Sequence, residues 1–236
     1  MTFTLLLGFF IGMTHALEAD HLAAVASFSV RKRSLKDTLK QAYSWGMGHT
    51  VTLFLVVVPV FLFGGNISHT TEAALEGIVG LMLCYLGGSL VYRLRKEKVH
   101  MHVHSHEDGE RHAHFHSHKD DAVEHSHSDH NHAHKAGVSP RALGIGLMHG
   151  LAGSAALLIY AQEVVEQKWA IVPYVFCFGV GSIAGMMLIS KVISFPLHAV
   201  KERSSISFNG IRAVVGIATV VLGLKFTGSS LTALLG

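Results

Sequence analysis

The chain has 236 residues, of which half are hydrophobic and only 15% are charged. A soluble domain of this size usually carries about 25% charged residues, so the deficit indicates a membrane protein. The two cysteines, Cys84 and Cys177, lie far apart in apolar blocks, so we expect buried free thiols rather than a disulfide framework.

Six apolar blocks have the length of about 20 residues that a helix needs to cross roughly 30 Å of hydrocarbon. In chain order, the predicted membrane helices cover roughly residues 3–28, 43–64, 74–93, 141–163, 169–194 and 208–228. The predicted fold class is therefore all-α, a polytopic membrane helix bundle. The chain divides into a first three-helix half at 1–98, a histidine-rich loop at 99–138 and a second three-helix half at 139–236.

The first block is interpreted as a retained membrane helix rather than a cleavable signal peptide. Ionisable side chains between His15 and His21 run through its centre, and its basic flank, Arg31 to Arg33, follows it instead of preceding it. Lysine and arginine also crowd the connections after the third and fifth blocks, whereas the alternate connections nearly lack them. The positive-inside rule then predicts a bacterial inner-membrane protein with both termini outside and the histidine-rich loop in the cytoplasm.

A weak internal repeat relates the two halves. The matched positions are Gly12 with Gly146, His15 with His149, Gly46 with Gly179, Gly48 with Gly181, Gly80 with Gly216, and Gly87 with Gly223. Three spans in each half would make the halves cross the membrane in opposite directions, as in the inverted repeats of secondary transporters. Chance similarity among glycine-rich helices is the alternative interpretation.

Ionisable groups at membrane depth are costly and therefore indicate function. Those that the sequence places well inside the predicted spans are His15, Glu18, Asp20 and His21 in the first, His49 in the second and His149 in the fourth. Imidazole and carboxylate together form a ligand set for nickel, cobalt, zinc or iron. We predict that His15, Asp20, His21, His49 and His149 bind metal. Hydrogen bonding between helices is the alternative role, and it is weakest for the cluster in the first span.

Helix geometry limits how this cluster can act. Between His15 and His21 a regular helix rises about 9 Å and turns about 600°, so the two rings would point about 120° apart. One metal ion could not bind both, because nitrogens bound at about 2.1 Å lie no more than about 4 Å apart. We therefore predict a distortion around residues 16–19. The repeat would bring His15 near His149, and Glu18, Thr50 and Ser154 are predicted to support the ligands from the surrounding layer.

The insert between the halves contains 13 of the 19 histidines. They are His100, His102, His104, His106, His112, His114, His116, His118, His125, His127, His130, His132 and His134. The alternation resembles a strand, but the segment has too few apolar residues for a core, so disorder is predicted. Flexible imidazoles bind divalent ions, zinc included, in competition with protons near the ordinary histidine pKa of about 6.5. The insert is predicted to be an auxiliary metal-binding loop; a solvated linker of biased composition is the alternative.

Three motifs resemble the nickel/cobalt transporter family. The segment from His15 to His21 is similar to its signature of histidine, four residues, aspartate and histidine, and Gly48-His49-Thr50 resembles its second motif. The run from Leu147 to Ala156 resembles a segment of its six-helix, urease-accessory-like branch. The resemblance implies transport of nickel or cobalt, with roles for His15, Asp20, His21 and His49. The larger members have eight spans with the signature on the second, whereas this chain has six with the signature on the first.

Several functions remain open at this point. Uptake of Ni²⁺ or Co²⁺ is favoured over efflux, although the histidine-rich insert also resembles that of the efflux branch. A zinc carrier, a membrane metalloenzyme with histidine boxes, and a metal-storing accessory protein for a nickel enzyme are the competing interpretations. We expect no enzymatic activity, no resident cofactor and no nucleic-acid partner. The expected partners are the metal ion, the lipid bilayer and nickel-enzyme maturation proteins; no oligomeric state is predicted.

Overall fold

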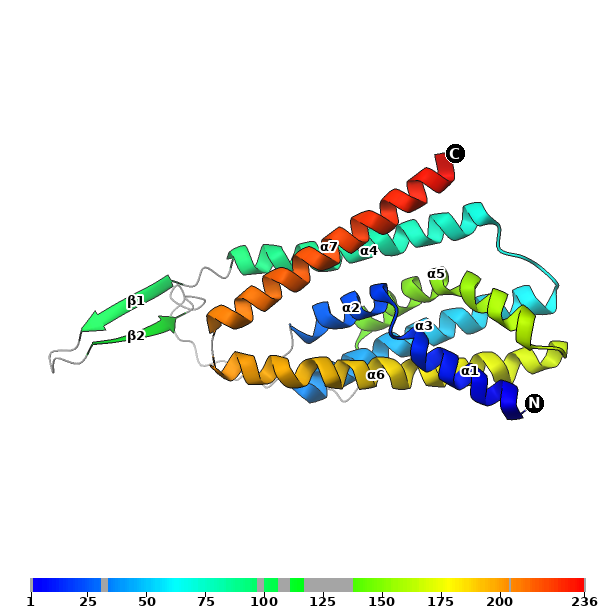
Figure 1. Cartoon of the computed structure of the whole chain (residues 1–236), viewed down its shortest axis with the longest axis horizontal. Coiled ribbons are helices and arrows are strands. Elements are labelled where there is room, and N and C mark those ends of the chain that lie inside the picture. Colours follow the sequence, from blue (N-terminus) through cyan, green and yellow to red (C-terminus); the bar gives the residue numbers. More distant parts are fainter. Residues whose placement is uncertain are drawn as a thin grey trace, which may run out of the picture.

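The computed structural model describes residues 2–30, 34–96, 100–105, 111–116, 138–203 and 205–235. Within these residues the helices are α1 (Thr2–His15), α2 (Ala19–Ser29), α3 (Leu35–Leu62), α4 (His69–Lys96), α5 (Pro140–Val164), α6 (Ile171–Arg203) and α7 (Ser205–Leu235). A single turn of 3₁₀ helix, Lys168–Ala170, precedes α6. Figure 1 shows the helices running side by side along the long axis of the molecule.

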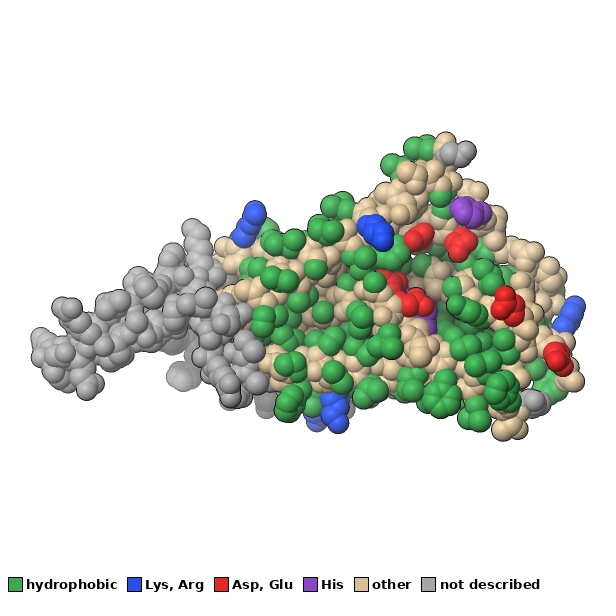
Figure 2. Space-filling view, in the orientation of Figure 1, with side chains coloured by type: hydrophobic (Ala, Val, Ile, Leu, Met, Phe, Trp, Pro, Cys, Tyr) green, Lys and Arg blue, Asp and Glu red, His purple; other side chains and the backbone are tan. Residues whose placement is uncertain are grey.

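The described part of the chain is long and apolar enough to cross a membrane several times. Helices α3 to α7 each contain a span by length and hydropathy, and α1 with α2 qualifies as one span bent by 58°. Large hydrophobic side chains such as Phe10, Leu55, Leu81, Phe176 and Leu188 are more than half exposed, and Figure 2 shows such side chains over much of the visible face. The chain is a multi-pass membrane protein, and the predicted helical fold class is confirmed.

The alternating helices give the bundle two ends with different connections (Figure 1). We call one the terminal end, because it holds both termini together with the connections 63–68 and 165–170. We call the other the insert end, because α2, α4 and α6 end there and α3, α5 and α7 begin there. On the predicted orientation, the insert end would face the cytoplasm.

Local sequence explains where α3 begins and ends. The Ser34 hydroxyl accepts a hydrogen bond from the backbone N–H of Asp37 at 3.1 Å and donates one to its carboxylate at 2.9 Å, which caps the helix start. At the other end Gly64 adopts a positive φ of 67°, and the N–H of Gly65 returns to the carbonyl of Val60 at 2.8 Å. Helix α3 therefore spans the bundle and delivers its midpoint to the centre.

Glycines bring the helix backbones into close contact. On α1, a side chain at Gly12 would overlap the carbonyl of Phe178 on α6, and on α5 one at Gly146 would overlap the carbonyl of Trp45 on α3. Gly181 of α6 and Gly48 of α3 make the reciprocal contacts with α1 and α5. The α1–α6 and α3–α5 crossings thus use glycines that the sequence repeat matches. The inverted repeat stays a prediction, which these paired contacts support.

Helices α4 and α7 form a pair of their own. A Cβ at Gly80 would lie 2.7 Å from the carbonyl oxygen of Gly223, and one at Gly87 would lie 2.5 Å from that of Gly216. This is the crossing expected where equivalent glycines of two repeats meet about a two-fold axis. Figure 1 shows α7 diverging from α5 and α6 toward the terminal end, so the pair stands apart from the other helices there.

Two larger apolar clusters fill the described bundle, one toward each end, and a third, smaller one around Leu90 lies further toward the insert end. Toward the insert end, α2, α3, α4 and α6 meet through buried residues such as Phe28, Trp45, Met82, Leu86 and Met186. Toward the terminal end, α3, α5 and α6 meet through buried residues such as Leu53, Val57, Leu157, Tyr174 and Phe178. Helix α4 contributes to the first cluster, and through Leu90 to the third, but not to the second. The level between the clusters is where the polar residues lie.

Part of the insert forms a β-hairpin instead of lacking regular structure. Strands β1 (His100–Ser105) and β2 (Arg111–His116) pair antiparallel, with His102 opposite His114. The prediction of disorder is therefore wrong for these two segments, because main-chain hydrogen bonds can hold a hairpin that buries no core. The predicted metal-binding residues His106, His118, His125, His127, His130, His132 and His134 lie outside the described residues.

Candidate metal centre

The predicted distortion of the first span is present. Helix α1 ends at His15, α2 begins at Ala19, and their axes differ by 58°. Between them, the N–H of Leu17 bonds to the carbonyl of Thr14 at 2.8 Å and the N–H of Glu18 to that of His15 at 3.1 Å. These tight turns end one helix and allow the next to start in a new direction. The geometric argument from the spacing of the two histidines is confirmed at this point.

The side chain of Glu18 connects the break between α1 and α2 with the candidate metal site. Glu18 occupies the N-cap position of α2 in an extended conformation, with φ −61° and ψ 150°, yet its side chain makes no capping hydrogen bond. The carboxylate instead turns back to Nδ1 of His15 at 2.7 Å. The negative end of the α1 dipole also points at the break, which favours a cation there.

Three histidines from three helices, α1, α2 and α3, converge beside the break. The ring centroids lie 4.5 Å apart for His15 and His21, 5.3 Å apart for His15 and His49, and 5.2 Å apart for His21 and His49. One ring nitrogen from each lies within 4.8 Å of the other two. His15 is 8% exposed, His21 1% and His49 0%. Small rotations of the rings would bring these nitrogens to within the roughly 4 Å that a shared metal ion requires.

The hydrogen bonds prepare these rings as ligands. Nδ1 of His15 contacts Glu18, and Nδ1 of His21 contacts Asp20 at 3.1 Å. A neutral imidazole that donates from Nδ1 keeps its lone pair on Nε2. Among the described residues, Nε2 of His15, Nε2 of His21 and both nitrogens of His49 are buried and have no hydrogen-bond partner. Unpaired acceptors in a buried place cost free energy, and carboxylates behind metal-binding histidines are the usual arrangement in metal sites, so a divalent transition metal fits this donor set.

Asp20 connects this group to the second half of the chain. Its Oδ1 accepts from the backbone N–H of His21 at 2.9 Å, and its Oδ2 lies 3.0 Å from Nε2 of His149. Asp20, His21 and His149 form a second group whose ligand atoms lie within 4.8 Å of one another. His149 also packs against Trp45, with ring centroids 5.4 Å apart. Asp20 thus supplies negative charge to the cluster, and His149 holds its outer oxygen.

The other predicted supporting residues lie elsewhere. The Thr50 hydroxyl donates to the carbonyl of Gly179 at 3.3 Å, which ties α3 to α6. The Ser154 hydroxyl donates to the carbonyl of Leu151 at 2.6 Å, within its own helix. Neither hydrogen bond reaches a residue of the histidine cluster. Of the three residues predicted to support the ligands, the structure places only Glu18 in contact with one.

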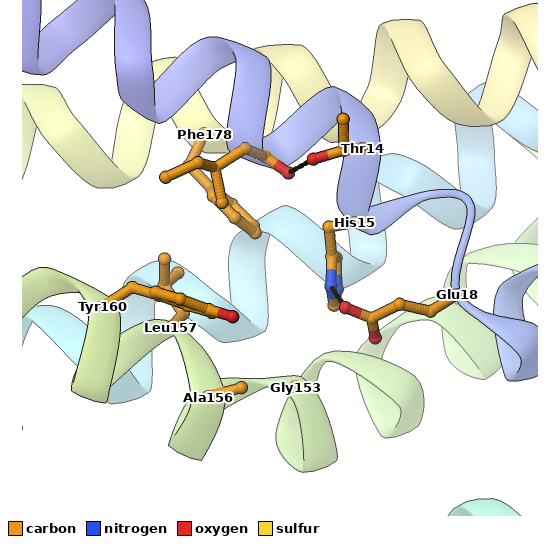
Figure 3. A pocket seen from close by; sticks show the side chains of 9 residues that line it. Thr14, His15, Glu18, Gly153, Ala156, Leu157, Tyr160 and Phe178 are labelled. Carbon is orange, nitrogen blue, oxygen red and sulfur yellow. Dashed lines mark hydrogen bonds and ion pairs between the residues drawn. The ribbon is translucent and has the colours of Figure 1, made fainter.

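Two cavities lead to the cluster from the surface. The smaller, of about 220 Å³, is lined by Ile11, Thr14, His15, Glu18, Gly153, Ala156, Leu157, Tyr160 and Phe178. Figure 3 shows His15 and Glu18 pointing toward each other on its wall, with Tyr160 across from them. The larger, of about 370 Å³, is lined by His15, Glu18, Ala19, Asp20, His21, Glu72, Glu76, Val79, Ala152, Gly153, Ala156 and Phe226. Both reach His15, so the buried site is connected to the surface of the bundle.

The sequence alone did not single out four residues around this site. Trp45 packs on His21 with ring centroids 5.4 Å apart, and a Cβ at Gly153 would lie 3.5 Å from Nε2 of His15. Glu72 and Glu76 line the larger cavity. A usable signal was present for the two glutamates, because acidic residues four apart at a helix start share one face.

The fold and the site together define a multi-pass membrane protein with a buried histidine–aspartate cluster that could hold a divalent metal. The chain is similar to the urease accessory protein UreH of Bacillus sp. (strain TB-90), with 31% identity over 222 residues, which cover 94% of this chain and 89% of that protein. The chain belongs to the family of this urease accessory protein. Its relative's name describes an accessory protein, which agrees with the expectation that the chain is not an enzyme. No family model and no solved structure matches the chain.

Proposed function

We propose that the protein carries a divalent transition metal, Ni²⁺ or Co²⁺, across the membrane through the site formed by His15, His21 and His49. The observation that carries this proposal is the set of buried, unpartnered ring nitrogens at the break between α1 and α2. Discontinuous helices at the middle of a membrane recur at the substrate sites of transporters. Here the C-terminus of α1, which is the negative end of its dipole, and the carboxylate of Asp20 provide a place for a cation.

The residues have separate roles in this proposal. The nitrogens of His15, His21 and His49 replace water molecules of the ion, and the carboxylate of Asp20 offsets part of its charge. His149 positions Asp20 through the 3.0 Å contact. Neutral nitrogen donors favour nickel, cobalt, copper or zinc over magnesium or calcium, which prefer oxygen ligands.

The choice of nickel rests on the relative and on the motif resemblance. UreH is named as a urease accessory protein, and supplying nickel for urease is a function that a membrane carrier can serve. This context favours uptake toward the cytoplasm of a bacterial cell, with the insert end facing inward. Maturation proteins of a nickel enzyme are then the protein partners that we propose, and the insert is a metal buffer beside the exit.

Flux measurements in proteoliposomes test the proposal. We expect wild-type protein to move nickel-63 and cobalt-57, Asp20→Ala to abolish the flux, and a deletion of residues 100–134 to retain it. Asp37→Ala is the matched control, because Asp37 lies at the start of α3 and its side chain contacts Ser34 rather than the cluster. Flux that persists in Asp20→Ala would refute the intramembrane site as the pathway. Metal binding by the insert without any wild-type flux would favour a membrane-tethered metal store.

Binding can be followed separately from transport. Trp45 packs against His21 and His149, whereas the other tryptophan, Trp169, is 55% exposed at the far end of the bundle. In a Trp169→Phe background, Ni²⁺ or Co²⁺ in the site should quench the fluorescence of Trp45. His21→Ala should remove that quenching, while titration with Mg²⁺ should leave the fluorescence unchanged.

A further inference from the structure

Helix α4 contributes two glutamates to the cavity that reaches the cluster. Glu72 lies in the first turn of α4 and Glu76 one turn further in, and both are partly buried. They share the wall of the roughly 370 Å³ cavity with His15 and His21. The two carboxylates therefore lie on the path between the terminal end and the metal ligands.

The charge of this cavity has a single sign. Its lining includes the carboxylates of Glu18, Asp20, Glu72 and Glu76, and no lysine or arginine. Within the described residues, neither Glu72 nor Glu76 forms an ion pair or a side-chain hydrogen bond. Two neighbouring carboxylates that no cationic side chain in this part of the chain neutralises attract a divalent cation.

A second observation shows that the cavity leads to a ligand site. Nε2 of His15 and Nε2 of His21 have no hydrogen-bond partner, and these two side chains are 8% and 1% exposed. Both residues line the cavity together with the glutamates. The acidic wall therefore ends at unused metal-binding nitrogens, which a set of surface carboxylates alone would not do.

The packing of the bundle gives the cavity one open direction. Toward the insert end, α4 joins the other helices through a closed apolar cluster that includes Phe28, Met82 and Leu86. Toward the terminal end, the apolar cluster joins α3, α5 and α6 and leaves α4 out. Figure 2 shows acidic side chains gathered on this part of the surface. A hydrated ion therefore meets carboxylates from one side and packed apolar side chains from the other.

We infer that Glu72 and Glu76 form an acidic vestibule through which the divalent metal reaches His15 and His21 from the terminal end, with Glu18 between the vestibule and the ligands. The inference rests on the proposed function. It adds the route by which the metal reaches the ligands and the side of the bundle from which it enters. Glu72 attracts the hydrated ion, Glu76 holds it about 6 Å deeper along the helix, and the histidines then replace its water. An acidic vestibule of this kind acts mainly on the rate at which the metal ion associates.

The rate of metal binding tests the vestibule directly. In the Trp169→Phe protein in detergent, stopped-flow quenching of Trp45 by Co²⁺ gives the association and dissociation rates. The double variant Glu72→Gln/Glu76→Gln should slow association about tenfold at low salt, with little change in dissociation. This difference should shrink as salt is raised, because salt screens exposed charges. Equal association rates at low salt would overturn the vestibule.

A matched control removes the same charge elsewhere. Glu163 and Glu166 are exposed at the same end of the bundle and line neither cavity. Glu163→Gln/Glu166→Gln should bind Co²⁺ at the wild-type rate, and a similar slowing in this control would show that only net charge matters. Glu76→Asp, which keeps the charge, should recover most of the rate in the presence of Glu72→Gln. Failure of this rescue would also count against the vestibule.

Sided flux separates this inference from the proposed function. In membrane vesicles of either orientation, the double variant should raise the KM about tenfold only for metal supplied at the terminal end, with kcat nearly unchanged. An equal change from both sides would overturn the assigned side. Metal binding that is slowed in the double variant, together with absent wild-type flux, would sink the transport proposal and leave the vestibule supported.

Discussion

The two halves of the bundle share a way of packing but not a chemistry. Gly12 presses α1 onto α6 at Phe178, and Gly146 presses α5 onto α3 at Trp45, so the matched glycines serve the same purpose. The first half nevertheless breaks its helix after His15, whereas α5 runs from Pro140 to Val164 through His149 without interruption. The comparison teaches that close helix contacts can be repeated while the helix break and the group of three histidines occur in one half only.

The broken helix explains this difference. The break lets His15 and His21 face each other across 4.5 Å, and His49 joins them from α3. The second half offers His149, which touches Asp20 instead of completing the group of three. We therefore call the first half the ligand half and the second half the supporting half. Mutations in the two halves should differ in their effect on metal binding.

The largest difference in metal affinity is expected between the His21→Ala and His149→Ala variants. His21→Ala removes a ring that belongs to both candidate groups, so Co²⁺ affinity measured by Trp45 quenching should fall about 100-fold or more. His149→Ala removes the partner of Asp20 and a member of the second group alone, and it should cost about tenfold. His149→Gln should recover part of this loss, because its amide N–H can replace the donor at Nε2. Equal losses for the two alanine variants would place His149 among the ligands.

The shared packing predicts matched losses of stability. Gly12→Ala and Gly146→Ala each drive a methyl group into a backbone carbonyl of the neighbouring helix, so each should destabilise the bundle by about 1–3 kcal/mol or more. Gly144→Ala is the control on α5, because a Cβ there meets nothing within 4 Å. Thermal unfolding in detergent measures all three. A large effect in only one half would argue against the two-fold relation between the crossings.

The sequence predicted the helices better than the site. Apolar length located the spans, because a helix that crosses hydrocarbon must be apolar over a fixed distance. The rotation between His15 and His21 predicted the break, since it depends on helix geometry alone. The partners of Asp20 were not predictable in this way. They depend on how α2 and α5 lie against each other, and the repeat suggested a His15–His149 approach where the structure has an Asp20–His149 contact.

The vestibule and the hairpin show two further limits. Glu72 and Glu76 stand at the start of a span, where acidic residues are ordinary, and only the position of α4 beside α2 gives them a role. In the insert, the alternating histidines of residues 100–105 and 111–116 do form paired strands, whereas the low apolar content predicted disorder. Local pattern predicts local structure, and convergence of side chains requires the packing.

The smallest expected effect comes from a glycine of the supporting half. A Cβ at Gly153 would lie 3.4 Å from Cε1 of His49 and 3.5 Å from Nε2 of His15, which are ordinary contacts. Gly153→Ala should therefore fold normally and occupy space beside a free ligand nitrogen. We expect Co²⁺ affinity to fall about fivefold while the unfolding temperature stays unchanged or rises, since alanine favours helix.

Gly144→Ala again supplies the comparison, because it makes the same substitution on α5 away from the cluster. It should leave both affinity and unfolding temperature near the wild-type values. If Gly153→Ala binds Co²⁺ as tightly as the wild type, the ion does not approach His15 from the α5 side, and the second half contributes only the contact of His149 with Asp20. If Gly153→Ala weakens binding and Gly144→Ala does not, α5 forms a wall of the metal site although it provides no ligand, and the division between the halves is one of ligands rather than of shape.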